Sequence, residues 1–201
     1  MREAEAFVVP TSSKYRTITD LLNDIKANPK AVAIGGGNYG GVDHVTVATL
    51  AETVGVKATD LNYIPYSGGG SLVPDVIGGR VAVGISGTSE FSSYVAAGKM
   101  RVLAVTSPKP LKVIKGKTLV QQGVDLTFGN WRGILAPADL SAADYLNTVK
   151  VIDALHSTPS WKATLVAKDW QNLNLYGKEF VSFLADQKKD ITATLVSLGL
   201  A

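Results

Sequence analysis

The sequence predicts an α/β protein with a parallel or mixed sheet covered by helices, and three observations indicate this class. Short β-branched runs alternate with amphipathic segments from residue 7 to residue 106. The connections between them are only a few residues long, as in βαβ units. Two clusters of glycines stand directly after a predicted strand and before a predicted helix.

The first half of the chain contains these elements in regular order. Leu21, Leu22 and Ile25 lie on one face of a predicted helix that Pro29 follows. Gly55 follows the next predicted helix and ends it. The predicted strands span 7–9, 31–34, 61–65, 81–85 and 101–106, and the predicted helices span 17–27, 42–54, 71–77 and 91–97.

The second half of the chain has a different pattern. Residues 107–117 are rich in proline and lysine, so a change of unit is expected between there and Pro137. A strand-like run passes through Trp131–Leu135, and a second alternating run suggests a strand at 171–175. Helices are predicted at 141–155, 160–167 and 177–198.

Composition excludes several classes of protein. A net charge of +3 over 201 residues is too weak to indicate a nucleic-acid partner. Without cysteine, and with only His44 and His156, the chain lacks the residues for a disulfide, a thiolate nucleophile or a histidine-rich metal site, so neither metal nor cofactor is expected. No apolar run is long enough to span a membrane, and the chain does not open with a secretory signal.

The glycine clusters indicate anion binding. The first turn of a helix leaves backbone N–H groups without partners and favours negative charge, and glycine allows a ligand to approach the backbone closely. The loops Gly35–Gly41, Tyr66–Gly70 and Ser86–Ser89 each follow a predicted strand. In a parallel sheet, such loops converge at the carboxyl ends of the strands, where ligands bind.

A nucleotide is an alternative ligand. Gly35, Gly37 and Gly40 have the spacing of a dinucleotide-binding loop, but no acidic residue follows the strand that ends at Tyr66. No nucleophile motif or acid–base pair stands out, so we expect a binding protein rather than an enzyme. His44 is expected to brace the loop, while Tyr66 is equally a ligand contact or an ordinary strand-end tyrosine.

Five motifs in register resemble the substrate-binding proteins of tripartite tricarboxylate transporters. Gly35–His44 resembles the family's G-S-x-G-x-G-S-x-x-H loop, and Ile64–Gly69 resembles V-P-Y-K-G-G. Asp75–Val81 is similar to D-L-L-G-G-Q-V, Ala97–Ser107 to A-G-K-L-R-A-L-A-V-T-S, and Trp131–Ala138 to W-F-G-L-L-A-P-A.

The resemblance implies a periplasmic binding protein of the type II kind. It implies a complete α/β lobe at residues 5–124, and a segment at 125–201 that belongs to a second, incomplete lobe. It also implies extracytoplasmic capture of a small carboxylate, of the dicarboxylate, tricarboxylate or acidic amino acid type, and delivery to a membrane permease. The residues that it implies for ligand binding are Gly36, Gly37, Asn38, Tyr39, Gly40, Gly41, Tyr66, Ser67, Gly68, Gly69, Ser86, Gly87 and Thr88.

Departures from the family pattern bear on affinity. Gly36 and Gly41 replace hydroxyl residues, Asn38 replaces a glycine, Ser67 replaces a lysine and Ala82 replaces an aspartate. The strand at 7–9 aligns well inside the family's chain, so the opening βα units and the signal peptide are expected to be missing. We therefore expect weak binding, with a remnant without binding activity as a further alternative, and a possible dimer through the exposed face of the incomplete lobe.

Overall fold

The computed structural model describes residues 1–201, and a five-stranded sheet with the order β4-β3-β5-β2-β6 forms its centre. Strand β3 is parallel to β4 and β5, whereas β2 is antiparallel to β5 and β6, so the predicted mixed sheet is confirmed. The strands are β2 (Glu5–Pro10), β3 (Ala33–Gly36), β4 (Asn62–Pro65), β5 (Val83–Gly87) and β6 (Met100–Val105).

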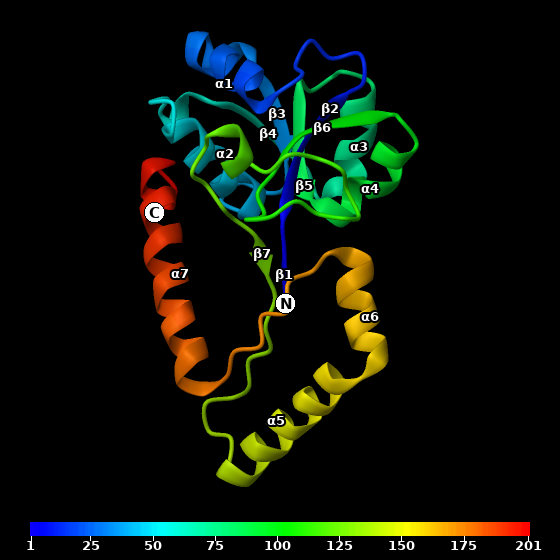
Figure 1. Ribbon diagram of the computed structural model, residues 1–201. Helices are drawn as coiled ribbons and strands as arrows, with labels where there is room; N and C mark the ends of the chain where they lie inside the picture. Colours follow the sequence, from blue (N-terminus) through cyan, green and yellow to red (C-terminus); the bar gives the residue numbers. More distant parts are fainter.

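Helices cover both faces of this sheet (Figure 1). They are α1 (Ile18–Ala27), α2 (Val42–Glu52), α3 (Gly69–Ile77) and α4 (Thr88–Ala96), and 3₁₀ turns occur at Pro29–Ala31, Ala58–Asp60 and Val120–Gln122. Helix α1 begins with a capping box in which the Thr17 side chain accepts from the Asp20 N–H. The reciprocal bond satisfies a second orphan donor, so this start is encoded locally.

Strand β2 divides the hydrophobic core into two layers, because successive side chains of a strand point to opposite faces. Phe7 and Val9 join the larger cluster beneath α1 and α2. Ala6 and Val8 join the smaller cluster beneath α3 and α4. All six residues of β2 are buried, as expected for a strand with neighbours on both edges and helices on both faces.

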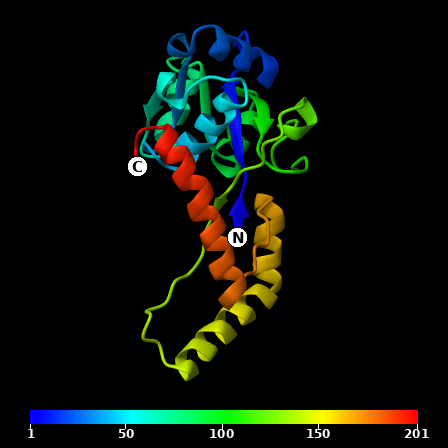
Figure 2. The ribbon, with the colours of Figure 1, turned by 90° about the vertical axis from the view of Figure 1, so that its left-hand side faces the viewer.

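The remaining elements lie outside this packed unit (Figure 2). Strands β1 (Arg2–Glu3) and β7 (Asn130–Trp131) form a separate antiparallel pair. They are joined to α5 (Ala142–Ser157), α6 (Pro159–Lys168) and α7 (Gly177–Ser197). Helix α7 returns to the sheet unit, where Leu195 and Leu198 pack with Ala48 of α2. Leu198 is the one buried residue after Leu126.

Two predicted strands are largely wrong, for the same physical reason. The alternating run 171–175 makes only a single bridge, between Arg2 and Gln171, and the run through Trp131–Leu135 contributes only Trp131 to β7. Without a neighbouring strand, alternation cannot form a ladder, and Ile134 and Leu135 are exposed instead. The predicted loop Ser86–Ser89 is also wrong, since β5 continues to Gly87 and α4 begins at Thr88.

The division of the chain near residue 124 stays a prediction. The five-stranded sheet lies before that point and α5, α6 and α7 lie after it. None of the helices combines the length and the apolar character required to cross a bilayer.

Close packing of β5 against α3 gives a stability test at Gly84. A Cβ atom at this position would lie 2.5 Å from Cγ2 of the buried Val76, whereas a Cβ at Gly70 would meet nothing within 4 Å. We expect Gly84→Ala to reduce the free energy of unfolding by about 1–3 kcal/mol, because a crowded core has no room for the methyl group. Gly70→Ala is the matched control and should not reduce it. Denaturant unfolding of both variants measures the difference, and equal stability would contradict the packing described here.

Candidate functional site

The carboxyl ends of three strands meet at one edge of the sheet. Strand β3 lies between β4 and β5 and runs parallel to both, so the chain leaves all three strands at the same edge. Helices α2, α3 and α4 begin there (Figure 1). The structure therefore brings the predicted segments 36–41, 66–69 and 86–88 to one place, which we call the loop edge.

Internal hydrogen bonds hold the first glycine loop. The Tyr63 hydroxyl donates to the Gly37 carbonyl over 2.7 Å, and the Gly37 N–H donates to Asp43 Oδ2 over 2.7 Å. The Gly40 N–H donates to His44 Nδ1 over 3.0 Å, and the Gly41 N–H donates to the Asn38 carbonyl over 2.9 Å. Three of the amides that the glycine pattern offered to a ligand thus already have acceptors.

His44 has the bracing role that its position predicted. Burial lowers its pKa, which favours the neutral imidazole that Nδ1 needs in order to accept from Gly40. Its ring stacks on that of Tyr63, with centroids 4.2 Å apart, and Tyr39 approaches it edge-on at 5.4 Å. The first glycine loop, β4 and α2 are therefore fixed to one another through aromatic contacts as well as hydrogen bonds.

Gly36 is glycine for a steric reason. A Cβ atom there would collide with the Tyr63 hydroxyl and would lie 2.9 Å from Cγ2 of Ile85. Position 36 thus cannot carry the family's hydroxyl residue here, because the Tyr63 hydroxyl fills the space that its side chain would need. Sequence alone suggested a lost side-chain donor, and the structure shows that the Tyr63 hydroxyl fills this space and donates to the Gly37 carbonyl.

Several amides of the loop edge have no acceptor in the protein. In the first loop they belong to Asn38 and Tyr39, followed by the first turn of α2. In the second loop they belong to residues 67–71, where Gly68 adopts a φ of 152° that side-chain-bearing residues rarely reach. These amides, at the starts of α2 and α3, are the donors that an anionic group could use.

Tyr66 links the two loops through its backbone and does not offer its hydroxyl. Its N–H donates to the Gly36 carbonyl over 2.7 Å. Its hydroxyl donates to Asp75 Oδ2 over 2.6 Å, and Asp75 also pairs with Arg80. Of the two interpretations of Tyr66, the structure favours the ordinary strand-end residue.

The third segment is satisfied by the beginning of the chain. The Thr88 N–H donates to the Ala4 carbonyl over 3.0 Å, and the Ser89 N–H donates to Glu3 Oε1 over 2.9 Å. Ser86 and Thr88 are buried, and a Cβ at Gly87 would lie 2.9 Å from the Glu3 carboxyl. A carboxylate of the protein itself therefore occupies the start of α4.

Sequence reasoning missed the acidic side chains of this edge. Glu3 and Glu5 come from β1 and β2, Asp43 comes from the first turn of α2, and Glu90 comes from the first turn of α4. The sequence can predict an acidic residue in the first turn of a helix, because negative charge is favourable there. The sequence cannot predict that Glu3 and Glu5 lie at this edge, because their position depends on the pairing of β2 with β5.

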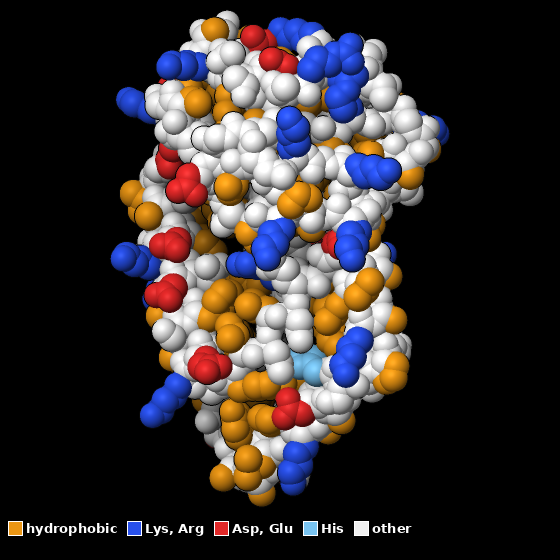
Figure 3. Space-filling view, viewed as in Figure 1, with side chains coloured by type: hydrophobic (Ala, Val, Ile, Leu, Met, Phe, Trp, Pro, Cys, Tyr) orange, Lys and Arg blue, Asp and Glu red, His pale blue; other side chains and the backbone are white.

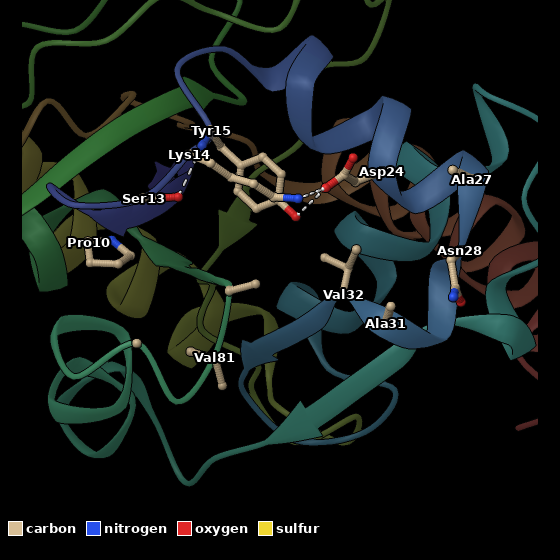
Figure 4. A pocket seen from close by; sticks show the side chains of 12 residues that line it. Pro10, Ser13, Lys14, Tyr15, Asp24, Ala27, Asn28, Ala31, Val32 and Val81 are labelled. Carbon is tan, nitrogen blue, oxygen red and sulfur yellow. Dashed lines mark hydrogen bonds and ion pairs between the residues drawn. The ribbon is translucent and has the colours of Figure 1, made fainter.

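A separate cavity lies at the opposite end of the sheet. It measures about 510 Å³ and is lined by Pro10, Tyr15, Asp24, Val32 and Val81, among others (Figure 4). Pro10 ends the antiparallel strand β2, while Val32 and Val81 precede β3 and β5. The Tyr15 hydroxyl donates to Asp24 over 3.0 Å inside it. None of the predicted binding residues lines this cavity.

Comparison with known proteins gives the chain its relatives. A 202-residue alignment with the UPF0065 protein in the gbd 5′ region of Cupriavidus necator is 25% identical and covers 96% of this chain. That alignment covers 58% of the relative, so this chain spans little more than half of the relative's length.

Two solved structures share the fold. A Rhodopseudomonas palustris protein with adipate has a TM-score of 0.77 at 20% identity, and covers 100% of this chain and 67% of its own. MatC from the same organism, with bound malate, has a TM-score of 0.77 at 12% identity, and covers 98% of this chain and 67% of its own. The predicted periplasmic-binding-protein fold class is confirmed by these likenesses.

The family match extends over nearly the whole chain. The family described as the tripartite tricarboxylate transporter family receptor matches residues 1–200. Of the motifs that carried the resemblance, Gly35–His44 and Ile64–Gly69 lie at the loop edge. The others span the end of α3, contain β6, or run from β7 toward α5. The chain therefore belongs to the tripartite tricarboxylate transporter receptor family.

Proposed function

We propose that this chain serves extracytoplasmic solute binding, capturing a small carboxylate for delivery to the membrane permease of a tripartite tricarboxylate transporter. The observation that carries the proposal is the set of free amides at the starts of α2 and α3, held in place by a loop whose other amides are satisfied. Backbone N–H groups at helix starts bind carboxylates without a cationic side chain. The family match and the carboxylates bound to two structural neighbours support this function.

In this proposal, the ligand binds the first two segments of the loop edge. Asn38 and Tyr39 offer donors in the first, and Ser67, Gly68 and Gly69 offer donors in the second. Ser86, Gly87 and Thr88 complete the wall behind them without offering a free helix start, since Glu3 occupies it. Gly36, Gly37, Gly40, Gly41 and Tyr66 shape the loops.

The same observations disfavour the dinucleotide alternative. A pyrophosphate on the first loop would require the amides that Gly37 and Gly40 already donate to Asp43 and His44. The family itself is a receptor family rather than an enzyme family.

Nuclear magnetic resonance titration of the ¹⁵N-labelled chain tests the carboxylate proposal. With malate or adipate, we expect chemical-shift changes at residues 38, 39, 42–44 and 67–71, because their amides have no internal acceptor. The amides of Thr88 and Ser89 should not move. We expect no such shift changes in the variant Gly68→Ala, because a side chain disfavours the φ of 152° at this position and would displace the loop. The control Gly98→Ala changes a glycine with a φ of 68° away from the loop edge, and it should show the same shift changes as the wild type.

The absence of any shift at millimolar ligand would contradict the proposal and would favour a remnant without binding activity. Changes that gather instead around the cavity near Tyr15 would place the ligand elsewhere.

Association of two copies is the second part of the proposal. All but three of the large hydrophobic side chains that are exposed lie after residue 133, on or beside α5, α6 and α7. Hydrophobic side chains are prominent in the lower half of the molecule in Figure 3, where α5 and parts of α6 and α7 lie. The set is Ile134, Leu135, Tyr145, Leu146, Val151, Leu155, Val166, Val181, Val196 and Leu200. An apolar surface of this kind is stabilised by covering it, and a second copy supplies a matching surface.

Light scattering over a range of protein concentrations tests the association. We expect dimers that dissociate on dilution, and we expect the double variant Leu146→Glu with Val181→Glu to be monomeric because it places charge in the apolar face. Val120→Glu, at an exposed position before that face, is the control and should still dimerise. A chain that stays monomeric at every concentration would exclude this association.

A further inference from the structure

We propose that Glu5 is a positioning residue whose buried, protonated carboxyl group donates a hydrogen bond to Asp43, and that this bond keeps the first glycine loop in the arrangement that receives a carboxylate. Loss of the proton then loosens the loop and weakens capture, so the loop edge responds to pH. The effect on the ligand rests on the proposed function, whereas the bond itself can be tested in the ligand-free chain.

Strand pairing brings Glu5 to the loop edge. Strand β2 is antiparallel to β5, and Glu5 lies opposite Gly87, the last residue of β5. Glu5, Phe7 and Val9 alternate onto the same face of the sheet, and the last two join the cluster beneath α1 and α2. The Glu5 side chain therefore extends this row toward the first turn of α2, where Asp43 lies.

The Glu5 carboxyl group is enclosed in the protein without a partner that could stabilise its charge. The residue is fully buried, and neither carboxyl oxygen accepts a hydrogen bond from an ordinary donor. Its main chain is held on both sides, because its N–H donates to Thr106 Oγ1 over 2.8 Å and its carbonyl accepts from the Thr106 N–H over 3.0 Å. The side chain thus stays inside, where an ionised carboxylate with no donor is costly.

The donors around Glu5 already have other acceptors. The Tyr63 hydroxyl donates to the Gly37 carbonyl over 2.7 Å. Arg132 Nη1 lies 3.7 Å from Glu3 Oε2, so its charge is directed to a different carboxylate. What remains to neutralise Glu5 is a proton of its own.

Asp43 is the acceptor for this proton. The side chains of Glu5 and Asp43 are in hydrogen-bond contact, and two carboxyl groups can form such a bond only if one of them is protonated. Asp43 Oδ2 also accepts from the Gly37 N–H over 2.7 Å, which favours its ionised form. Glu5 has no comparable donor, so the proton belongs on Glu5.

The surrounding charges favour the same assignment. Burial, followed by the charge of Asp43 and the hydrogen bond to it, raises the pKa of Glu5 well above its usual range. Glu3 of β1 adds to this rise, and Arg132 after β7 opposes it. On the other side of the pair, burial raises the pKa of Asp43, and the charge of Glu90 in α4 adds to that rise.

The other titratable groups at this place do not change charge near neutral pH. Burial, followed by the charges of Asp43 and Glu5, raises the pKa of Tyr63 in β4, so this tyrosine stays protonated. Burial lowers the pKa of His44 in α2, which keeps the imidazole neutral above about pH 6.5. A change of charge here as the pH rises above neutrality therefore belongs to the pair of Glu5 and Asp43.

The proton matters for binding because Asp43 also holds the loop. Asp43 contacts Glu5 on one side and the Gly37 N–H on the other. When Glu5 ionises, two carboxylates face one another in a buried place, and their repulsion displaces Asp43. The Gly37 amide then loses its acceptor, and the free amides of Asn38 and Tyr39 lose their fixed positions. The loop edge also gains a negative charge, which opposes an arriving carboxylate.

Carbon-13 magnetic resonance of the ligand-free chain tests the proton directly. At about pH 6, where ordinary carboxyl groups are ionised, we expect the Glu5 carboxyl carbon to have the chemical shift of a protonated acid. As the pH rises further, Glu5 should ionise and the Gly37 amide should shift with the same midpoint. The N–H groups of Arg16 and Thr17 donate to Asp20 and lower its pKa, so their amides should shift only in acid.

An ionised Glu5 carboxyl group at about pH 6 would overturn this inference and leave the proposed function standing.

The variant Glu5→Gln keeps the bond and removes the titration. Its side-chain amide donates to Asp43 at every pH, so the Gly37 amide should no longer shift as the pH rises above neutrality. Glu52→Gln removes a carboxyl group from the exposed far end of α2, and as the matched control it should titrate like the wild type. A Gly37 shift that titrates alike in Glu5→Gln and the wild type would assign the titration to another group and overturn the inference.

Stability should fall with pH for the same reason. The native chain keeps a proton that the Glu5 side chain of the unfolded chain releases above about pH 4.3. From there to the midpoint of the Glu5 titration, the ratio of folded to unfolded chain should fall about tenfold per pH unit relative to Glu5→Gln. Denaturant unfolding at several pH values measures this ratio, and a ratio that follows the same course in both proteins would contradict the buried proton.

Titration with malate on either side of the midpoint tests the effect on capture. We expect the dissociation constant of the wild type to rise by up to about tenfold per pH unit above the midpoint, and that of Glu5→Gln to stay nearly constant. A wild-type affinity that passes through the midpoint unchanged would overturn the link between the proton and the loop. Failure of malate and adipate to bind at any pH would overturn the proposed function, while the carbon-13 measurement would still decide whether Glu5 holds the proton.

Discussion

The arrangement of the loop edge depends on the contact between the Tyr63 hydroxyl and the backbone of the first glycine loop. Tyr63 fills the space above Gly36 and donates to the Gly37 carbonyl, which fixes the direction in which the chain leaves β3. His44 and Asp43 then satisfy the amides of Gly40 and Gly37. Because these groups are used, the amides that remain free are few and their positions are set before any ligand arrives.

At the loop edge, a side chain of the protein occupies the start of one helix, and the starts of two others remain free for a ligand. Glu3 occupies the start of α4, whereas the starts of α2 and α3 keep free amides beside Asp43 and Glu90. A helix start favours negative charge, so the protein's own carboxylates compete there with a carboxylate ligand.

The sequence was sufficient for the alternating strands and helices before residue 106, and for bringing the glycine loops to one edge, because these follow from periodicity and short connections. It was insufficient where a long-range partner decides. Residues 171–175 alternate like a strand but have no neighbour to pair with, and Glu3 reaches the start of α4 only because β2 pairs with β5. No local pattern reveals that Tyr63 replaces the hydroxyl group missing at Gly36.

Amide hydrogen exchange in the ligand-free chain tests the central claim, that the first loop is ordered by its own hydrogen bonds. Gly37 and Gly40 donate to Asp43 and His44, while the neighbouring amides of Asn38 and Tyr39 have no acceptor and act as internal controls. We expect Gly37 and Gly40 to exchange much more slowly than Asn38 and Tyr39. Equally fast exchange at all four amides would show that the loop is not held before the ligand binds, and would contradict this account.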